Sequence, residues 1–277
     1  MTSDTDRVGG QAARLPSRPA VDPARWLLRR LPVDAAGALF CFPYSGVGAS
    51  SFREWPKELA GLHVVPIQPP GRENRIREQA LTTHQEFAAS FAEALHLLDG
   101  RPFAFFGHCG AVLYLLEVIR LLEERDEPLP MWVMSSSWGG PQLGLHGDIN
   151  YVDLETYDFR REVLAMAGRQ GAVMEPVVAD MAAALLKFDA TVHRGYSYPD
   201  GWRVPVPVTA VAWTEDDMIP PETALAGWDV VADVEPVTLD GSHTAYQNCP
   251  ADLRAAIVAT QERWGAGTMK RPNAKEA

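Results

Sequence analysis

The chain has 277 residues, a formal net charge of −11 and 47% hydrophobic residues. This size and composition are typical of a globular protein with a substantial core. The acidic charge argues against a nucleic-acid partner, because phosphate binding needs clustered Lys and Arg. No apolar run is long enough to span a bilayer, and the first residues lack a secretion-signal pattern. We therefore expect a cytoplasmic monomer that contacts no membrane. The three cysteines form no CxxC pair, so we expect no metal site.

Short apolar runs alternate with helical patterns, which predicts an α/β fold with a mostly parallel sheet and helices on both faces. The predicted strands cover residues 37–42, 63–68, 102–106, 131–136, 206–213 and 234–239. The predicted helices cover residues 50–60, 82–98, 111–125 and 250–264. Residues 1–20 and 265–277 are rich in small and polar residues, and we expect them to be flexible tails of one domain over residues 21–264.

One long segment, from about residue 139 to residue 202, contains no predicted strand. Two helical patterns lie within it, at residues 153–168 and 176–192, with Gly-rich linkers around them. A helical insertion late in an α/β sheet is often a lid over a site, although an extra packing layer without a gating role has the same pattern. The many methionines of the segment supply adaptable apolar surface, which favours the lid.

The stretch FFGHCGAVLYLL, residues 105–116, places a cysteine between a predicted strand and a predicted helix. Gly107 and Gly110 flank the turn, and Ala111 opens the helix. A strand, small residues and a helix in this order are typical of a nucleophile elbow, in which the backbone is strained and the helix packs close to the strand. We therefore predict that Cys109 is a nucleophile. The alternative is a buried structural cysteine.

A candidate acid and a candidate base follow later in the chain. Three acidic residues come directly after the strand at 206–213, and an acid at the end of a strand can orient a catalytic histidine. Asp217 is our first choice, with Asp216 as the alternative. His243 lies in the loop LDGSHTAYQN after the last predicted strand. The order nucleophile, acid, histidine is the order found in α/β hydrolases.

The stretch FCFPYSGVGASSF after the first strand is a candidate for the oxyanion hole. The chemistry needs two backbone N–H donors, one from the residue after the nucleophile and one from a loop after an early strand. These would be the N–H groups of Gly110 and Ser45. The alternative is a Gly-rich turn without a catalytic donor.

Five segments together resemble the type II thioesterases of polyketide and nonribosomal peptide synthesis. They are LFCFPYSGVGASSFREWPKEL, VVPIQPPGRENRIRE, RPFAFFGHCGAVLYLLE, VPVTAVAWTEDDMIPP and GSHTAYQN. Such enzymes commonly read FPxAGG, PGRExR, GHSMGA, a GxDD-type strand end and GGH. The resemblance runs from about Trp26 to Trp264. Here Cys109 replaces the serine, Gly110 the methionine and Ala111 the second glycine.

The resemblance implies an α/β-hydrolase fold with a helical lid, acting on acyl or aminoacyl groups held as phosphopantetheine thioesters on an acyl or peptidyl carrier protein. It implies no cofactor besides the pantetheine of the partner. The family baseline is hydrolysis through an acyl-Cys109 intermediate. A cysteine also suits transfer between carriers, because one thioester becomes another and the acyl group stays activated. A non-catalytic carrier-binding relative and a hydrolase of small free esters are weaker alternatives.

Docking of an acidic carrier on this acidic chain would need a local basic patch. Arg72, Arg75 and Arg77 are the candidates, although a solvated run of charges has the same pattern.

Overall fold

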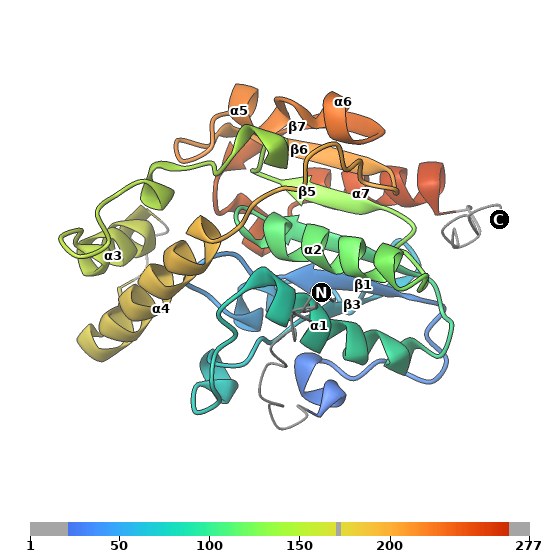
Figure 1. The fold of residues 1–277 in the computed structure, drawn as a ribbon, viewed down its shortest axis with the longest axis horizontal. Helices are drawn as coiled ribbons and strands as arrows, with labels where there is room; N and C mark the ends of the chain where they lie inside the picture. Colours follow the sequence, from blue (N-terminus) through green and yellow to red (C-terminus); the bar gives the residue numbers. More distant parts are fainter. Residues whose placement is uncertain (1–21, 170–172, 266–277) are drawn as a thin grey trace, which may run out of the picture.

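The computed structural model describes residues 22–169 and 173–265, which form a layered α/β structure (Figure 1). Its sheet has seven strands in the order β2-β3-β1-β4-β5-β6-β7, all parallel except β2. The strands are β1 (Ala38–Phe42), β2 (Glu58–Leu59), β3 (Leu62–Pro66), β4 (Phe103–His108), β5 (Val133–Ser136), β6 (Val208–Glu215) and β7 (Val234–Ser242). The α-helices are α1 (His84–Leu95), α2 (Ala111–Glu124), α3 (Phe159–Arg169), α4 (Pro176–Arg194), α5 (Pro221–Leu225), α6 (Trp228–Val231) and α7 (Ala251–Trp264). The predicted α/β fold with a mostly parallel sheet is confirmed.

Both faces of the sheet are covered, because alternate residues of each strand point to opposite sides. On one face Phe40, Phe42 and Phe105 pack in the core cluster that includes α1 and α2. On the other face Leu39 and Phe106 pack in the cluster that includes residues of α7. Strands buried on both faces read as continuous apolar runs, which is why the strand signals in the sequence are strong.

The helix α1 begins where the sequence supplies a cap. The Thr83 side chain accepts a hydrogen bond from the backbone N–H of Glu86, and the Glu86 carboxylate accepts one from the N–H of Thr82. The first of these bonds satisfies one of the N–H groups that a helix start would otherwise leave without a partner, and the second fixes the chain just before the helix.

Two predicted helices differ from the observed ones. The predicted helix at 50–60 is wrong: a 3-10 helix, Ala49–Phe52, is followed by turns and by the short antiparallel strand β2. Pro56 has no N–H for a helix interior, which explains the break. The predicted helix at 153–168 begins six residues too early, because residues 153–158 form turns and bends before α3.

The predicted lid segment contains α3 and α4, which pack against each other through a small core of their own. Figure 1 shows this pair at one side of the sheet, apart from α1, α2 and α7. Between β5 and β6 the described residues contain no strand. Whether the pair gates a site stays a prediction. The two predicted tails lie outside the described residues, apart from residue 265. None of the described helices is long and apolar enough to cross a membrane.

Candidate active site

Cys109 occupies a sharp turn between β4 and α2. Its φ of +53° lies in the left-handed region, which is unusual for a residue other than glycine. Such a backbone conformation costs on the order of 1–3 kcal/mol and is maintained only where the surroundings enforce it. Here the Cys109 N–H donates to the carbonyl of Ser136 at 2.8 Å. At Gly107 a Cβ would lie 2.3 Å from Leu115 Cδ2 on α2, so a larger residue there would displace this buried side chain. The structure therefore has the predicted elbow, with Cys109 half-buried at its apex.

His243, in the loop after β7, lies between an aspartate and the cysteine. Its Nδ1 is 2.8 Å from Oδ2 of Asp216, which follows β6. Its Nε2 has no hydrogen-bond partner of regular geometry among the described residues. The Cys109 thiol is nevertheless close enough to interact with the imidazole. The structure therefore brings together Cys109, His243 and Asp216, with the imidazole between the carboxylate and the thiol.

The acid beside His243 is Asp216 and not Asp217, our first choice. Asp216 is buried, and its carboxylate accepts four hydrogen bonds. The donors are His243, the Ser137 hydroxyl at 2.7 Å, and the N–H groups of Met218 and Ile219 at 3.0 and 2.8 Å. The last two bonds form because the chain turns tightly around Asp216, as Asp side chains favour. Asp217 is exposed and lines the cavity beside Cys109.

Electrostatics favour a charged imidazole at this position. Burial lowers the pKa of His243, but the hydrogen bond that its Nδ1–H donates to Asp216 and the interactions with Cys109 outweigh this effect and raise the pKa to about 10. Burial raises the pKa of Asp216, yet the hydrogen bonds from His243, Ile219 and Ser137 hold it below its usual value. At neutral pH the aspartate is therefore ionised and the imidazole is protonated.

His108 lies beside the base rather than in the reaction site. Its ring stacks on Tyr246 at a centroid distance of 4.1 Å and contacts the His243 ring at 4.5 Å. Nδ1 of His108 is 2.9 Å from the Ser136 hydroxyl. Burial and the neighbouring His243 lower the pKa of His108 well below its usual value. A neutral His108 can thus pack against His243 without repelling it, which is a structural role.

The two residues predicted for the oxyanion hole both line the cavity that contains Cys109. Gly110 comes directly before α2, and Ser45 lies in the turn after β1. Neither backbone N–H donates to a backbone carbonyl within the described residues. The two residues adjoin each other, because a Cβ on Gly110 would lie 3.0 Å from Ser45 Oγ.

A buried ion pair, which the sequence did not indicate, lies behind the Ser45 turn. Arg72 bonds to both carboxylate oxygens of Asp189 on α4, at 2.6 and 3.0 Å, and donates to the carbonyl of Val47 at 2.7 Å. Arg75 is also buried and pairs with Glu78. Two of the three arginines considered for carrier docking are thus internal, and only Arg77 of that group is exposed.

Two adjoining cavities meet at the candidate site. The one that contains Cys109 and His243 measures about 210 Å³, and its lining includes the carboxylates of Asp148, Glu162 and Asp217. The second measures about 300 Å³ and lies toward Ser50 and Arg53. Both are lined by Tyr44, Ser45, Met166 and Leu186. Side chains of α3 and α4 therefore form walls of both cavities. Within the described residues, no group of three or more His, Cys, Asp or Glu side chains could hold a metal ion.

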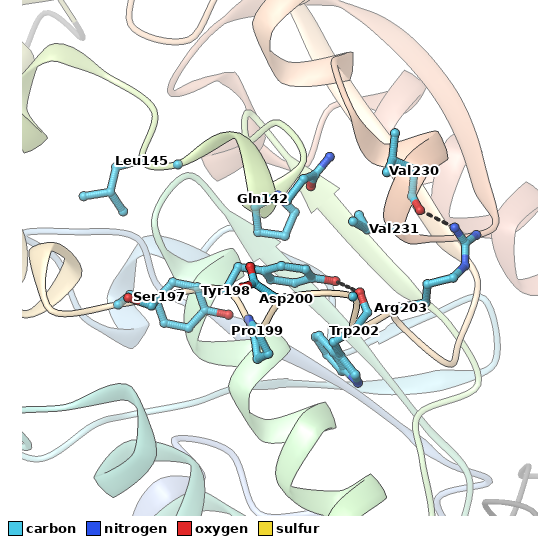
Figure 2. A pocket seen from close by; sticks show the side chains of 14 residues that line it. Gln142, Leu145, Ser197, Tyr198, Pro199, Asp200, Trp202, Arg203, Val230 and Val231 are labelled. Atoms are coloured by element: carbon cyan, nitrogen blue, oxygen red, sulfur yellow. Dashed lines mark hydrogen bonds between the residues drawn. The ribbon is translucent and has the colours of Figure 1, made fainter.

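A larger cavity, of about 560 Å³, lies elsewhere (Figure 2). Residues 196–203 form one wall, with Gln142, Val230 and Val231 opposite. The Tyr198 hydroxyl donates to the carbonyl of Trp202, and Arg203 donates to the carbonyl of Val230. None of Cys109, His243 and Asp216 lines this cavity.

The elbow, the base and the acid, each at the carboxyl end of a parallel strand, define an enzyme of the α/β-hydrolase class. The sequence model of the thioesterase domain matches residues 38–162. The gramicidin S biosynthesis protein GrsT of Aneurinibacillus migulanus is 33% identical over 186 residues, which cover 65% of this chain and 70% of GrsT. The chain therefore belongs to the thioesterase family.

Two further similarities extend over most of the chain. Linear gramicidin dehydrogenase LgrE of Brevibacillus parabrevis is 28% identical, over 89% of this chain and 96% of LgrE. The structure of the thioesterase RedJ from the prodiginine pathway of Streptomyces coelicolor superimposes with a TM-score of 0.68 at 27% identity. It covers 90% of this chain and 96% of RedJ.

Proposed function

We propose that this protein is a type II thioesterase of nonribosomal peptide or polyketide synthesis, which hydrolyses acyl or aminoacyl groups from the phosphopantetheine of a carrier protein. The observation that carries the proposal is the alignment of Cys109, His243 and Asp216 in a thioesterase fold. The names of GrsT and RedJ, which refer to gramicidin S and prodiginine biosynthesis, support the pathway class.

The first half of the reaction is acylation of the cysteine. The proton of the Cys109 thiol passes to Nε2 of His243, and the resulting thiolate attacks the thioester carbonyl carbon. The N–H groups of Gly110 and Ser45 stabilise the oxyanion that forms. The carbon–sulfur bond to pantetheine then breaks, and the leaving thiolate takes the proton from Nε2 of His243. Asp216 keeps the imidazole oriented throughout. The products are acyl-Cys109 and the free pantetheine thiol.

The second half of the reaction is hydrolysis. His243, now neutral, takes a proton from water as the water oxygen attacks the acyl carbon. The bond to Sγ breaks, and the acid leaves as Cys109 is restored. The carboxylates of Asp148, Glu162 and Asp217 in the lining favour water in this cavity, because buried waters occupy polar sites.

Transfer to a second carrier is the alternative that the identity of the nucleophile favours. The acyl-Cys109 bond is itself a thioester, so attack by another pantetheine thiol is nearly neutral in energy. A serine would form an oxygen ester instead, from which return to a thioester is uphill. The two adjoining cavities support either reaction, since one can hold the acyl group and the other the pantetheine arm.

The test is to mix the protein with a carrier that bears a labelled acyl thioester and to record intact masses over time. We expect an adduct on the wild type that is absent from Cys109→Ala, together with release of free acid. A second, unloaded holo carrier then separates the reactions. Label that moves to this carrier indicates transfer, whereas acid released at the same rate with or without it indicates hydrolysis.

Cys109→Ser is the matched control, because it keeps the elbow and exchanges only the nucleophilic atom. We expect this variant to lose any transfer activity and to retain hydrolysis. Absence of both adduct and turnover on carriers loaded with short acyl, long acyl and aminoacyl groups would refute the enzymatic proposal. The predicted cytoplasmic location, the monomeric state and the absence of a cofactor stay predictions.

A further inference from the structure

The turn that carries Ser45 is held by the helix α4. Three successive residues of the turn contact the helix or its ion-pair partner. The Ser45 hydroxyl is 3.0 Å from Nε2 of His193, and the Gly46 N–H donates to Oδ2 of Asp189 at 2.7 Å. The carbonyl of Val47 accepts from Arg72, which is itself bound to Asp189. The position of a proposed oxyanion donor is therefore set by side chains of α4.

His193 also lies against the second proposed donor. A Cβ on Gly110 would be 2.5 Å from Nε2 of His193 and 3.1 Å from its Cδ2. Contacts under 3.0 Å do not occur between a real Cβ and another heavy atom without a shift of one of them. The imidazole thus fills the volume that a side chain at position 110 would take. Position 110 must therefore lack a side chain for His193 to occupy this place.

The surroundings of His193 keep its ring neutral and fixed. Burial lowers its pKa to about 4, with Asp189 opposing this effect and Arg72 adding to it. Its Nδ1 is 3.2 Å from Nε2 of His84, whose ring stacks on Tyr114 at 4.4 Å. A neutral imidazole has one donor nitrogen and one acceptor nitrogen. Each ring nitrogen of His193 has a partner, Nε2 the Ser45 hydroxyl and Nδ1 the His84 ring. The ring orientation is thereby determined from both sides.

We propose that His193 is a positioning residue for the oxyanion hole: it anchors the Ser45 hydroxyl and packs on Gly110, so that the two backbone N–H groups converge on the acyl oxygen at Cys109. The proposal rests on the proposed function in that an acyl group must react at Cys109. The ring of His193 need not touch the substrate. Removal of the anchor should slow any reaction through a tetrahedral oxyanion and leave other reactions of the thiol unchanged.

Two small reagents separate these effects without a carrier protein. With p-nitrophenyl acetate, the cysteine sulfur attacks the carbonyl and nitrophenolate leaves, which requires an oxyanion. With iodoacetamide, the sulfur displaces iodide and no oxyanion forms at a carbonyl. Cys109→Ala gives the background, since Cys41 and Cys249 are buried. Both rates are followed by intact mass.

For His193→Ala we expect acylation to slow by about 10-fold or more, since loss of one oxyanion donor costs roughly 10²–10³. We expect alkylation to stay within about twofold of wild type. His193→Gln, which can still bond to Ser45, should recover part of the acylation rate. Gly110→Ala should have the same selective defect, because the new methyl group displaces the ring. Ser45→Ala removes the anchored hydroxyl, keeps the backbone, and provides the test if His193→Ala fails to fold.

Equal loss of both rates, or no loss of acylation, would overturn the proposal. The proposal would also be overturned if the ratio of the acylation rate to the alkylation rate of the wild type were no higher than that of a free thiol. The outcome stays separate from that of the proposed function. A selective defect with p-nitrophenyl acetate, combined with no reaction of the wild type on any carrier thioester, would retain the role of His193 and refute the carrier substrate.

Discussion

The imidazole of His243 is hydrogen-bonded to Asp216 at 2.8 Å, while the next residue, Asp217, lines the cavity beside Cys109. Two neighbouring acids thus have different surroundings. The Asp216 carboxylate is enclosed by four donors, and that of Asp217 is exposed. Substitution of each in turn separates the orientation of the base from the polarity of the cavity.

For Asp216→Asn we expect kcat/KM to fall by about 10²- to 10⁴-fold, because the amide neither stabilises the imidazolium nor fixes its tautomer. Asp217→Asn is the matched control and should stay within a few-fold of wild type. Steady-state kinetics on a carrier-bound or small thioester measure both. A larger loss for Asp217→Asn than for Asp216→Asn would return the role to our first choice.

The pH dependence of stability should report the charged His243. Its pKa of about 10 in the folded protein lies above the ordinary value of 6.5. A raised pKa means that the stabilisation is complete below pH 6.5 and is lost as the pH rises through about 10. Denaturant unfolding of wild type and His243→Gln should therefore show a difference in the free energy of unfolding that shrinks as the pH rises from about 6.5 to about 10. A constant difference would contradict the charged state.

The ion pair between Arg72 and Asp189 should dominate the stability of the region behind the Ser45 turn. Both side chains are buried, at 6% and 0% exposure. Arg72→Met leaves an unpaired buried carboxylate, and we expect it to lower the free energy of unfolding by about 3–5 kcal/mol. The exposed pair of Arg160 and Asp180 is the control, and Arg160→Met should cost about 1 kcal/mol or less. Similar losses in the two variants by denaturant unfolding would contradict this ranking.

Alanine substitution of Gly46 and of Gly61 separates the cost of backbone strain from an effect on the candidate site. Their φ values are similar, +82° and +76°, so alanine should cost about 1–2 kcal/mol of stability at either position. Of the two, only Gly46 lies beside α4, where an added Cβ would be 3.3 Å from Cβ of Leu186. An added Cβ on Gly61 would have no neighbouring atom within 4 Å. We expect Gly46→Ala to slow acylation of Cys109 and Gly61→Ala to leave it unchanged. Equal acylation rates would show that the turn tolerates displacement.

The fold and the triad order could be predicted because they depend on local patterns. Doubly buried strands read as apolar runs, and the elbow needs small residues around Cys109 at fixed positions. The choice between Asp216 and Asp217 depends instead on the side to which the chain turns after β6. Because most of β6 is buried on both faces, its sequence has no alternation from which that side could be read.

The roles of His193 and Asp189 could not be predicted for a different reason. They lie about 80 residues after Cys109, on a helix whose pattern alone does not show which loop it will contact. The absence of a side chain at Gly110 was the available signal, since it left a volume beside the nucleophile that some other group had to fill. Arg72 was misjudged for the same reason, because its partner on α4 is distant in sequence.

The attachment of the Ser45 turn to α4 makes the two helices of the predicted lid unequal. A movement that lifted α4 would break the bonds to Ser45 and Gly46 and displace the proposed oxyanion donor, so we expect a displaced α4 to slow the reaction at Cys109. The helix α3 contributes Met166 and Glu162 to the Cys109 cavity and none of the bonds to that turn. We therefore expect substrate to enter past α3, while α4 keeps its contacts with the Ser45 turn.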